Sequence, residues 1–467
     1  MKKRITALVA AVLFIAAVLS SCNAVPLIAT VDSLLTPPLY YSEYEGLVSA
    51  FNSSVESSVV LCNPTEGDHL SAITVSDVDR DDSEEGIVFF RDTLEENTAH
   101  FSLFKNTDDV WNKMCEFKGY GNEVRSLTLT DLDGDGTEEL IVIWSYSGID
   151  GGNVVAVYKA SGKSLDYEEI LFESCEIARP VDFDGNGQEE IFFITSSKSE
   201  NAVTKTAKLF GYYEDSLTEI GSTPVDPSAI SYSTFKTEKA VEQAPLKVYV
   251  DAVKSNNMMI TEVFYWDEEN GRLADPLYDA EVGANMATLR FEQLQCADVN
   301  NDGQIEIPVQ SVYSEPQSDD DETLYLTEWT YFDYDKPVFT ESTFVNVSDG
   351  YLVNLGVLGK EKLYIRKHSG GDWASWSVYT DSKSSVSGNV LFTIIKVPKE
   401  RWQSDMVGSS NYITILKQLD SVVCVNINEK GKAAGLDEAK IKTIVTRMIA
   451  VSIKSFLTFG FAKMFSL

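Results

Sequence analysis

The sequence predicts an all-β protein built from repeated four-stranded units. Acidic segments of one shared template recur along the chain, and aromatic-ended strands recur with the same spacing. The stretches between them are rich in β-branched and aromatic residues and show no helical period. Short strands repeating with a period of about 50 residues are typical of a β-propeller. We therefore expect a propeller of about six or seven four-stranded blades over residues 39–395.

The composition argues against a nucleic-acid partner. The 467 residues include 38 Lys and Arg against 72 Asp and Glu, which gives a net charge of −34. Binding to a phosphate backbone needs clustered cations, and a surface this acidic repels it. The expected partners are instead a surface protein or a glycan.

Residues 1–21 are predicted to be a lipoprotein signal peptide. A basic start, Lys2 to Arg4, precedes an apolar run from Ile5 to Leu19, as in secretory signals. The tetrad that ends at Cys22 resembles the lipobox of bacterial lipoproteins, which implies that Cys22 is lipidated. An ordinary signal peptide with an incidental cysteine, or an uncleaved anchor, is the alternative.

Residues 22–38 are then expected to form a lipidated tether, because they are mixed in composition and contain proline. Lipidation at Cys22 implies a secreted protein held by its N-terminal lipid on the outer face of the bacterial cytoplasmic membrane. The folded body is therefore predicted to be extracellular.

Two independent markers set the repeat period. Four acidic loops start at Asp77, Asp131, Asp182 and Asp298, and these starts are separated by 54, 51 and 116 residues. The last interval is twice 58, which indicates a repeat that has lost its loop. We number the loops as loop 1 (77–85), loop 2 (131–139), loop 3 (182–190) and loop 4 (298–306).

The second marker is an aromatic residue at the end of a strand in each repeat. Phe104, Tyr158, Phe210 and Phe264 are separated by 54, 52 and 54 residues. Phe264 lies in the interval without an acidic loop, so the loop is missing there and the repeat is not. Within one repeat we expect strands at 126–130, 140–144 and 154–158.

The acidic loops are predicted to bind Ca²⁺. Calcium takes six to eight oxygen ligands, and alternate acidic residues on a tight turn bring several oxygens to one point. Glycine at position 6 allows the turn a positive φ. The candidate ligands at positions 1, 3, 5 and 9 are Asp77, Asp79, Asp81 and Glu85 in loop 1, Asp131, Asp133, Asp135 and Glu139 in loop 2, Asp182, Asp184, Asn186 and Glu190 in loop 3, and Asp298, Asn300, Asp302 and Glu306 in loop 4.

These loops and their flanking strands resemble the FG-GAP or VCBS-type repeats of integrin-α-like β-propellers, which occur in bacterial surface lipoproteins. The resemblance covers roughly residues 60–390. It implies that position 7 adds a backbone carbonyl and that the position-9 glutamate closes the calcium shell. Loop 1 departs from the pattern with Asp82 in place of glycine. The position-7 residues are Ser83, Thr137, Gln188 and Gln304.

Two alternatives concern the role of the loops. Each loop could be an ordinary Asp/Asn/Gly turn whose side chains bond their own backbone. If calcium binds, a structural role is expected because the motif recurs, whereas metal catalysis needs one singular site with an open coordination position.

No catalytic motif is found, so we expect a non-enzyme. The only histidines are His69, His100 and His368, and none lies in a metal-binding or nucleophile motif. Carboxylate-pair chemistry on a polysaccharide, or phosphoester chemistry, remains the alternative. The sequence as a whole predicts a calcium-stabilised binding module for a protein or glycan. A structural accessory of an envelope assembly is the third interpretation.

Residues 396–467 are expected to form a small α+β element. Strands are predicted at 390–397, 412–418 and 422–427, and a helix from Asp437 to about Met448. The tail 449–467 is apolar but contains Lys454 and Lys463, so a helix packed on the body or on the membrane surface is expected rather than a spanning one.

Overall fold

The structure is a computed structural model of the 467-residue chain. The predicted signal peptide, Cys22, the tether and the apolar tail 449–467 lie outside the described residues. The structure describes residues 44–448 apart from 56–58, 94–97, 147–151, 161–164, 201, 214–215, 239–245, 256, 292–293, 301, 315–323, 334–335, 357–362, 369–374, 381–388, 407–408 and 410.

The fold is all-β, and its strands form antiparallel sheets that follow one another along the chain. Sheets 1 to 3 are made by consecutive strands. Sheet 1 contains β1 (Val59–Leu61), β2 (Ile73–Ser76), β3 (Glu85–Asp92), β4 (Ala99–Thr107) and β5 (Val110–Lys118). Sheet 2 contains β6 (Glu123–Thr130), β7 (Glu139–Ser145), β8 (Asn153–Ala160) and β9 (Tyr167–Cys175). Sheet 3 contains β10 (Ile177–Val181), β11 (Glu190–Lys198), β12 (Val203–Tyr213) and β13 (Ser216–Val225).

Sheets 4 to 6 complete the described chain. Sheet 4 contains β14 (Ala229–Thr237), β15 (Lys247–Lys254), β16 (Met259–Asp267) and β17 (Arg272–Ala274). Sheet 5 contains β18 (Ile307–Ser314), β19 (Leu324–Asp333), β20 (Lys336–Asn346), β21 (Tyr351–Asn354) and β27 (Val445–Arg447). Sheet 6 contains β22 (Tyr364–His368), β23 (Ser375–Tyr379), β24 (Val390–Pro398), β25 (Ile413–Lys417) and β26 (Ser421–Ile427).

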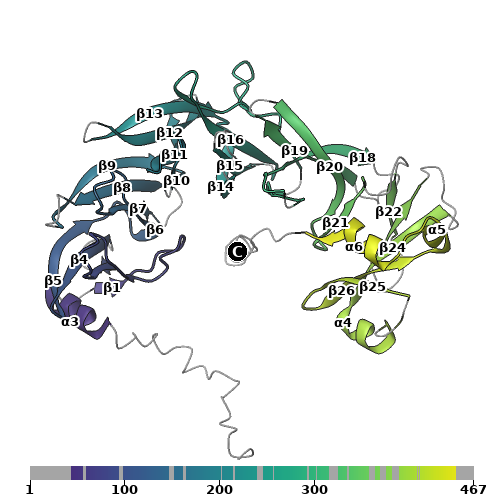
Figure 1. Ribbon diagram of the computed structural model, residues 1–467, viewed down its shortest axis with the longest axis horizontal. Coiled ribbons are helices and arrows are strands. Elements are labelled where there is room, and N and C mark those ends of the chain that lie inside the picture. The colour runs from purple at the N-terminus through teal and green to yellow at the C-terminus, as the bar shows by residue number, and fades with distance from the viewer. Residues whose placement is uncertain are drawn as a thin grey trace, which may run out of the picture.

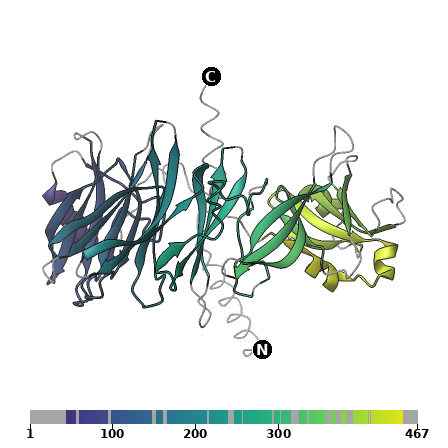
Figure 2. The ribbon, with the colours of Figure 1, turned by 90° about the horizontal axis from the view of Figure 1, so that it is seen from above.

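The six sheets are arranged along an open arc (Figure 1). Sheet 1 lies at one end of the arc and sheet 6 at the other, and the described residues do not close into a ring. Seen from above, the sheets stand side by side (Figure 2). The all-β prediction is therefore confirmed. The predicted closed propeller of four-stranded blades is not found among the described residues, whose four- and five-stranded sheets form an open array.

Each pair of neighbouring sheets is held together by apolar side chains. Phe89 and Phe101 of sheet 1 lie in one buried cluster with Trp144 and Tyr158 of sheet 2. Similar buried clusters join sheets 2 and 3, 3 and 4, 4 and 5, and 5 and 6. Because both faces of the middle strands are covered, a strand such as β7 is almost wholly buried, whereas the outer strand β5 alternates between partly buried and exposed residues.

The strands expected within a repeat are confirmed as β6, β7 and β8, each slightly longer than predicted. The period is visible because acidic turns and aromatic strand ends alternate along the chain. The repeat without an acidic loop is sheet 4, and its aromatic marker Phe264 lies on β16 as expected. The lost loop therefore leaves the four-stranded sheet intact.

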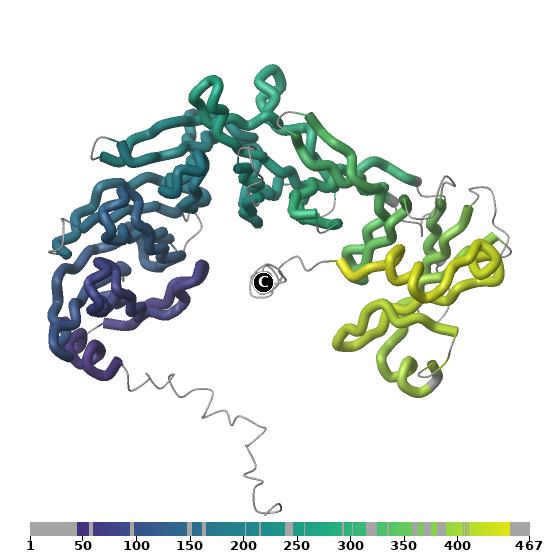
Figure 3. The backbone as a smooth tube through the Cα atoms, in the orientation of Figure 1, coloured from purple at the N-terminus to yellow at the C-terminus, as the bar shows by residue number. Residues whose placement is uncertain are grey.

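The C-terminal strands extend the array. The strands predicted at 390–397, 412–418 and 422–427 are β24, β25 and β26, and all belong to sheet 6. β24 pairs with β23 on one side and with β26 on the other, so strands from both sides of residue 395 share one sheet. The chain then returns to sheet 5, where β27 pairs with β21 (Figure 3).

In the part of the chain that the structure describes, helices are few and short. They are α3 (Glu45–Ser54), α4 (Lys399–Arg401), the π-helix η4 (Trp402–Met406), α5 (Glu429–Ala433) and α6 (Glu438–Ile444). Asp437 caps α6 by accepting a hydrogen bond from the Lys440 N–H, as its sequence position predicts. The helix is shorter than expected because residues after Ile444 leave it to form β27. No helix among the described residues has the length and apolar character to cross a membrane.

Candidate metal sites and an adjoining cavity

The four acidic loops occupy equivalent places in their sheets. Loop 1 joins β2 to β3, loop 2 joins β6 to β7, and loop 3 joins β10 to β11. Loop 4 leads into β18, and its ends meet at a bridge between Ala297 and Glu306. The position-9 glutamates Glu85, Glu139 and Glu190 are the first residues of the strands that follow. The same turn is therefore built four times.

A shared set of hydrogen bonds shapes each turn. In every loop the position-9 glutamate accepts a bond from the backbone N–H of position 2, and the position-1 aspartate accepts one from the N–H of position 6. The first set comprises Val78–Glu85 at 3.0 Å, Leu132–Glu139 at 2.7 Å, Phe183–Glu190 at 2.8 Å and Val299–Glu306 at 3.0 Å. The second comprises Asp82–Asp77, Gly136–Asp131, Gly187–Asp182 and Gly303–Asp298, each at 3.0 Å.

The position-5 side chain is held in the same way. Its carboxylate or amide oxygen accepts a bond from the N–H of position 7. These pairs are Ser83–Asp81 at 2.9 Å, Thr137–Asp135 at 2.8 Å, Gln188–Asn186 at 2.6 Å and Gln304–Asp302 at 2.8 Å. The loop backbone thus fixes the side chains of positions 1, 5 and 9 in the same way in all four loops.

Position 6 has a positive φ in all four loops. Gly136, Gly187 and Gly303 have φ values of 92°, 91° and 93°. Asp82 takes the same place in loop 1 with φ 67°, a conformation that a residue with a Cβ adopts at some cost. The turn of loop 1 is therefore formed without glycine.

Three of the loops can hold a metal ion. In each, one carboxylate oxygen from positions 1, 3 and 9 lies within 4.8 Å of the other two. These groups are Asp77, Asp79 and Glu85; Asp131, Asp133 and Glu139; and Asp182, Asp184 and Glu190.

Loop 4 uses an amide at position 3. Asn300 Nδ2 donates to Asp302 at 2.8 Å and to Glu306 at 3.2 Å, while its Oδ1 accepts from the Asp302 N–H at 2.8 Å. The amide bonds to the same carboxylates that a cation would contact. Rotation of this side chain would turn its oxygen toward such a cation.

Loop 1 already contains a cation from the protein itself. Lys105 Nζ lies 2.7 Å from Asp79, 2.8 Å from Asp81 and 3.3 Å from Glu85. Burial lowers the pKa of Lys105, but its hydrogen bonds to Asp79 and Asp81 outweigh that effect and hold the pKa above its ordinary value. The ammonium group therefore lies where a metal ion would contact the same oxygens.

Loop 2 has a similar arrangement. Lys159 forms an ion pair with Asp133 and donates to the Tyr212 hydroxyl at 2.7 Å. Arg80 of loop 1 reaches the position-1 carboxylate of loop 2, Asp131, at 3.6 Å. Lys105 directly follows the aromatic marker Phe104, and Lys159 directly follows Tyr158. The position after the marker is therefore a sequence signal for such a lysine.

Loop 3 has no such lysine. The residue after the marker Phe210 is Gly211, and a Cβ there would lie 3.4 Å from Cγ of Glu190. Asp182 and Asp184 form no ion pair among the described residues, and Asp182 Oδ1 is buried without a hydrogen-bond partner. In sheet 5 the residue opposite the position-9 glutamate Glu306 is Tyr331, because the neighbouring residues Ile307 and Thr330 pair with each other. Loops 3 and 4 therefore lack the internal cation of loops 1 and 2.

In sheet 4 a lysine stands where the other repeats have the position-9 glutamate, and it pairs with a carboxylate. Lys247 is the first residue of β15, where the other repeats have glutamate, and it pairs with Tyr265 across the sheet. Its Nζ lies 3.4 Å from Glu238. The repeat without an acidic loop has replaced the buried position-9 carboxylate by a cation.

The position-9 glutamates have unusual pKa values. Burial raises the pKa of Glu85, Glu139, Glu190 and Glu306 to about 7, although a backbone N–H bond opposes the shift in each case. The neighbouring aspartates of each loop raise it further. Without a metal ion, these groups therefore favour the protonated form in the folded protein.

This pKa shift predicts how stability depends on pH. Between about pH 4.5 and about pH 7 the folded protein holds protons that the unfolded chain has released, so stability without calcium falls as pH rises. We expect chemical denaturation in EDTA to give a larger free energy of unfolding at about pH 5.5 than at about pH 7.5. Calcium should reverse this trend because it binds the ionised carboxylates. A stability that rises with pH in EDTA would contradict the assignment. Glu190→Gln should make the profile less steep, because it removes one of the four glutamates with a raised pKa.

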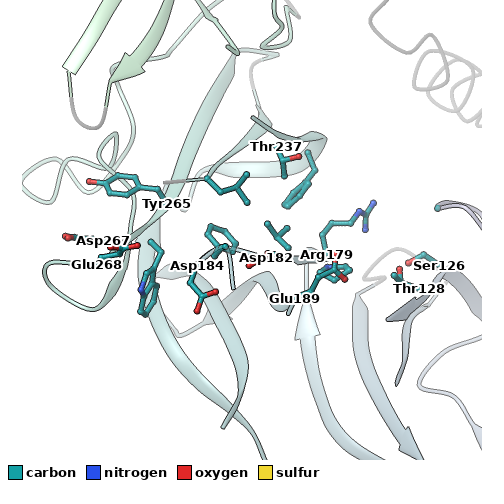
Figure 4. Close-up of a pocket in the computed structure, with 18 of the residues that line it drawn as sticks. Ser126, Thr128, Arg179, Asp182, Asp184, Glu189, Thr237, Tyr265, Asp267 and Glu268 are labelled. Carbon is teal, nitrogen blue, oxygen red and sulfur yellow. The ribbon is translucent and has the colours of Figure 1, made fainter. Parts of the chain in front are cut away.

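A cavity of about 1450 Å³ adjoins loop 3 (Figure 4). It is lined from three sheets: Ser126 and Thr128 on β6, Arg179 on β10, and Tyr265 on β16. Loop 3 contributes Asp182, Asp184 and Glu189, and the turn after β16 contributes Glu268 and Glu269. No local pattern in the sequence marks this cavity, because it forms only where sheets 2, 3 and 4 stand together.

Comparisons with known proteins give weak similarity only. No family model matches this sequence, and no curated protein matches it. Bacillus licheniformis rhamnogalacturonan lyase PL11 aligns with 14% identity and a TM-score of 0.30, over 71% of this chain and 77% of that one. Rhamnogalacturonan lyase YesW aligns with 14% identity and a TM-score of 0.28, over 68% and 72%. Similarity at this level says nothing about the activity of this chain, which the fold and loops define as an all-β repeat protein with acidic turns that could hold a metal ion.

Proposed function

We propose that this chain is a lipid-anchored, calcium-stabilised array of FG-GAP or VCBS-type blades that binds a protein or glycan outside the cell. The observation that carries the proposal is the repetition of one acidic turn at equivalent places in four sheets. The N-terminal sequence supports the anchor, with Cys22 as the lipidated residue. Secretion places the protein where millimolar calcium is available to weak sites.

Calcium binding is favoured at loops 3 and 4. Three or four carboxylates within a few ångströms repel one another unless a cation lies between them. Lys105 and, in part, Lys159 supply that charge in loops 1 and 2. Loops 3 and 4 have no lysine at this position, so their carboxylates are neutralised by an ion from solution or, without one, by protonation of Glu190 and Glu306. In loops 1 and 2 calcium must displace a lysine, and we expect weaker binding there.

The role of the ion is structural. Loops 1 to 3 each join two paired strands of their sheet, and their ligands come from the turn and the start of the following strand. A cation at this place fixes the turn and the register of both strands. The repetition of the site, with lysine serving in some sheets, fits a part of the scaffold and not a singular catalytic centre.

Two other functions remain as alternatives. A polysaccharide- or phosphoester-active enzyme would need convergent catalytic groups in one pocket. His100 is buried against Phe90 and lies 3.7 Å from Glu116, which places it in the core of sheet 1 and away from the cavity. A structural accessory of an envelope assembly would use the scaffold without a ligand.

Titration calorimetry tests the calcium assignment. We expect Asp182→Asn with Asp184→Asn to lower the number of bound calcium ions by one, because two of the carboxylates of loop 3 are lost. The control is Glu268→Gln with Glu269→Gln, which removes the same charge from exposed residues outside the loop. An unchanged stoichiometry in the loop variant would overturn the assignment of loop 3.

A further inference from the structure

We propose that the cavity beside loop 3 binds a lysine- or arginine-rich peptide segment of a partner protein. The inference deepens the binding function proposed above and rests on it, because it names the class of ligand. It is carried by the charge, the aromatic lining and the size of the cavity, taken together.

The charge of the cavity is strongly negative. Its lining includes one basic residue, Arg179, which already forms an ion pair with Glu66 at 3.6 Å. The acidic residues of the lining are Asp68, Asp182, Asp184, Glu189, Asp267, Glu268 and Glu269. A calcium ion in loop 3 would neutralise two of these charges and leave the lining negative.

Several of these carboxylates are available to a ligand. Asp68, Glu268 and Glu269 are exposed, and none of them forms an ion pair within the described part of the chain. Asp267 differs, because Arg272 lies 3.2 Å away. Hydrogen bonds from Asn270 and the Arg272 pair lower the pKa of Asp267 and keep it ionised. Clustered carboxylates at the edge of a cavity concentrate cations there.

Aromatic side chains form part of the wall. Phe235, Tyr265 and Trp266 line the cavity, and Figure 4 shows Tyr265 at the same end as Asp267 and Glu268. An aromatic ring attracts a lysine or arginine side chain through its π face. Carboxylates beside aromatic rings thus suit the charged head and the apolar stem of a basic side chain. Neutral and acidic glycans lack the positive charge that this lining favours.

The dimensions favour a chain segment over a small ion. At about 1450 Å³ the cavity exceeds the usual range for a drug-sized ligand. Its lining extends from β6 of sheet 2 across loop 3 to the turn after β16 of sheet 4. An extended peptide can contact all three sheets with alternate side chains.

Fluorescence anisotropy with a labelled hexalysine peptide tests the proposal on the full chain in calcium. We expect Asp68→Asn with Glu268→Gln and Glu269→Gln to weaken binding about tenfold, since each exposed ion pair contributes about 0.5 kcal/mol. The affinity of the unaltered protein should also fall with added salt. The control triple variant Glu400→Gln, Glu429→Gln and Glu438→Gln removes the same charge from exposed residues of the C-terminal helices and should bind normally.

Three outcomes would overturn the peptide site. The first is equal binding of the peptide to both triple variants, which would show that the effect comes from the net charge of −34 alone. The second is no binding of the peptide, and the third is binding of an acidic oligogalacturonide in its place. Calcium stoichiometry is measured on the same samples, so failure of the peptide with intact calcium binding would leave the proposed function standing. If the peptide binds but calcium does not, the peptide site would stand and the calcium part of the proposed function would be overturned.

Discussion

Lys105→Met is expected to lower the free energy of unfolding in EDTA by about 3 kcal/mol. Lys105 contacts three carboxylates of loop 1, and the Asp79 and Glu85 side chains are 1% and 0% exposed. Without the ammonium group the buried Asp79 carboxylate has no counter-ion, and Glu85 avoids repulsion only by taking up a proton. The variant also opens the space that a calcium ion would fill. Adding calcium should therefore restore most of the lost stability, as measured by urea denaturation with and without the ion.

The matched control is Lys208→Met. Lys208 forms a cross-strand ion pair with Glu219 at 3.1 Å and is similarly exposed, 23% against 19% for Lys105. Its partner is a single, partly exposed carboxylate, so the loss should stay below about 1 kcal/mol and should not respond to calcium. Equal losses in the two variants, or no rescue of Lys105→Met by calcium, would contradict the view that lysine replaces a metal ion in loop 1.

Arg290→Met is expected to have the largest effect on stability, a loss of about 3–5 kcal/mol. Arg290 and Asp251 are both fully buried, with Nη2 2.7 Å from Oδ1. The guanidinium also donates to Thr261 Oγ1 at 3.0 Å and to the Leu294 carbonyl oxygen at 2.5 Å. The variant leaves a buried carboxylate without its cation. The segment between β17 and loop 4 would lose one of its attachments to sheet 4, while those of Asn285 and Thr288 remain.

A double-mutant cycle separates the ion pair from general packing. Adding Asp251→Asn to Arg290→Met removes the uncompensated charge, so the double variant should be more stable than the sum of the two single losses predicts. Arg272→Met serves as the surface control, since Arg272 is 65% exposed and pairs with Asp267. Urea denaturation of the four proteins measures the coupling. Additive losses would show that the pair contributes no specific interaction.

Much of the fold follows from local signals in the sequence. The acidic turns end strands at fixed places because their side chains bond their own backbone, and Gly136, Gly187 and Gly303 supply the positive φ. Aromatic residues such as Phe104 and Tyr158 mark the strands that pack between sheets. These features depend on residues close together in the chain, so the period and the strands could be predicted.

The arrangement of the sheets depends on contacts that the sequence does not display. Whether a series of blades closes into a ring depends on the twist between neighbouring sheets, which is set by packing such as that of Phe192 against Phe264. The residues that follow α6 also take a conformation that long-range contacts decide. Residues 445–447 were expected to continue the helix, but pairing with β21 in another part of the chain takes them into a strand.

The candidate sites were predictable in part. In loops 1 to 3 the carboxylate oxygens of positions 1, 3 and 9 lie close together, whereas in loop 4 the Asn300 amide nitrogen faces the carboxylates. The template does not mark the lysines that neutralise loops 1 and 2. Lys105 faces Glu85 only through the register of β3 with β4, which brings together residues 20 positions apart. The cavity was missed for a similar reason, because its lining comes from three sheets.

A thermal melt of the unaltered protein in EDTA and in millimolar calcium, with bound metal counted by native mass spectrometry, tests the central claim most directly. We expect calcium to raise the melting temperature by several degrees, since an ion that binds only the folded state stabilises it by mass action. At least two ions should bind, one at loop 3 and one at loop 4. An unchanged melting temperature with no bound metal would mean that all four acidic loops are metal-free turns.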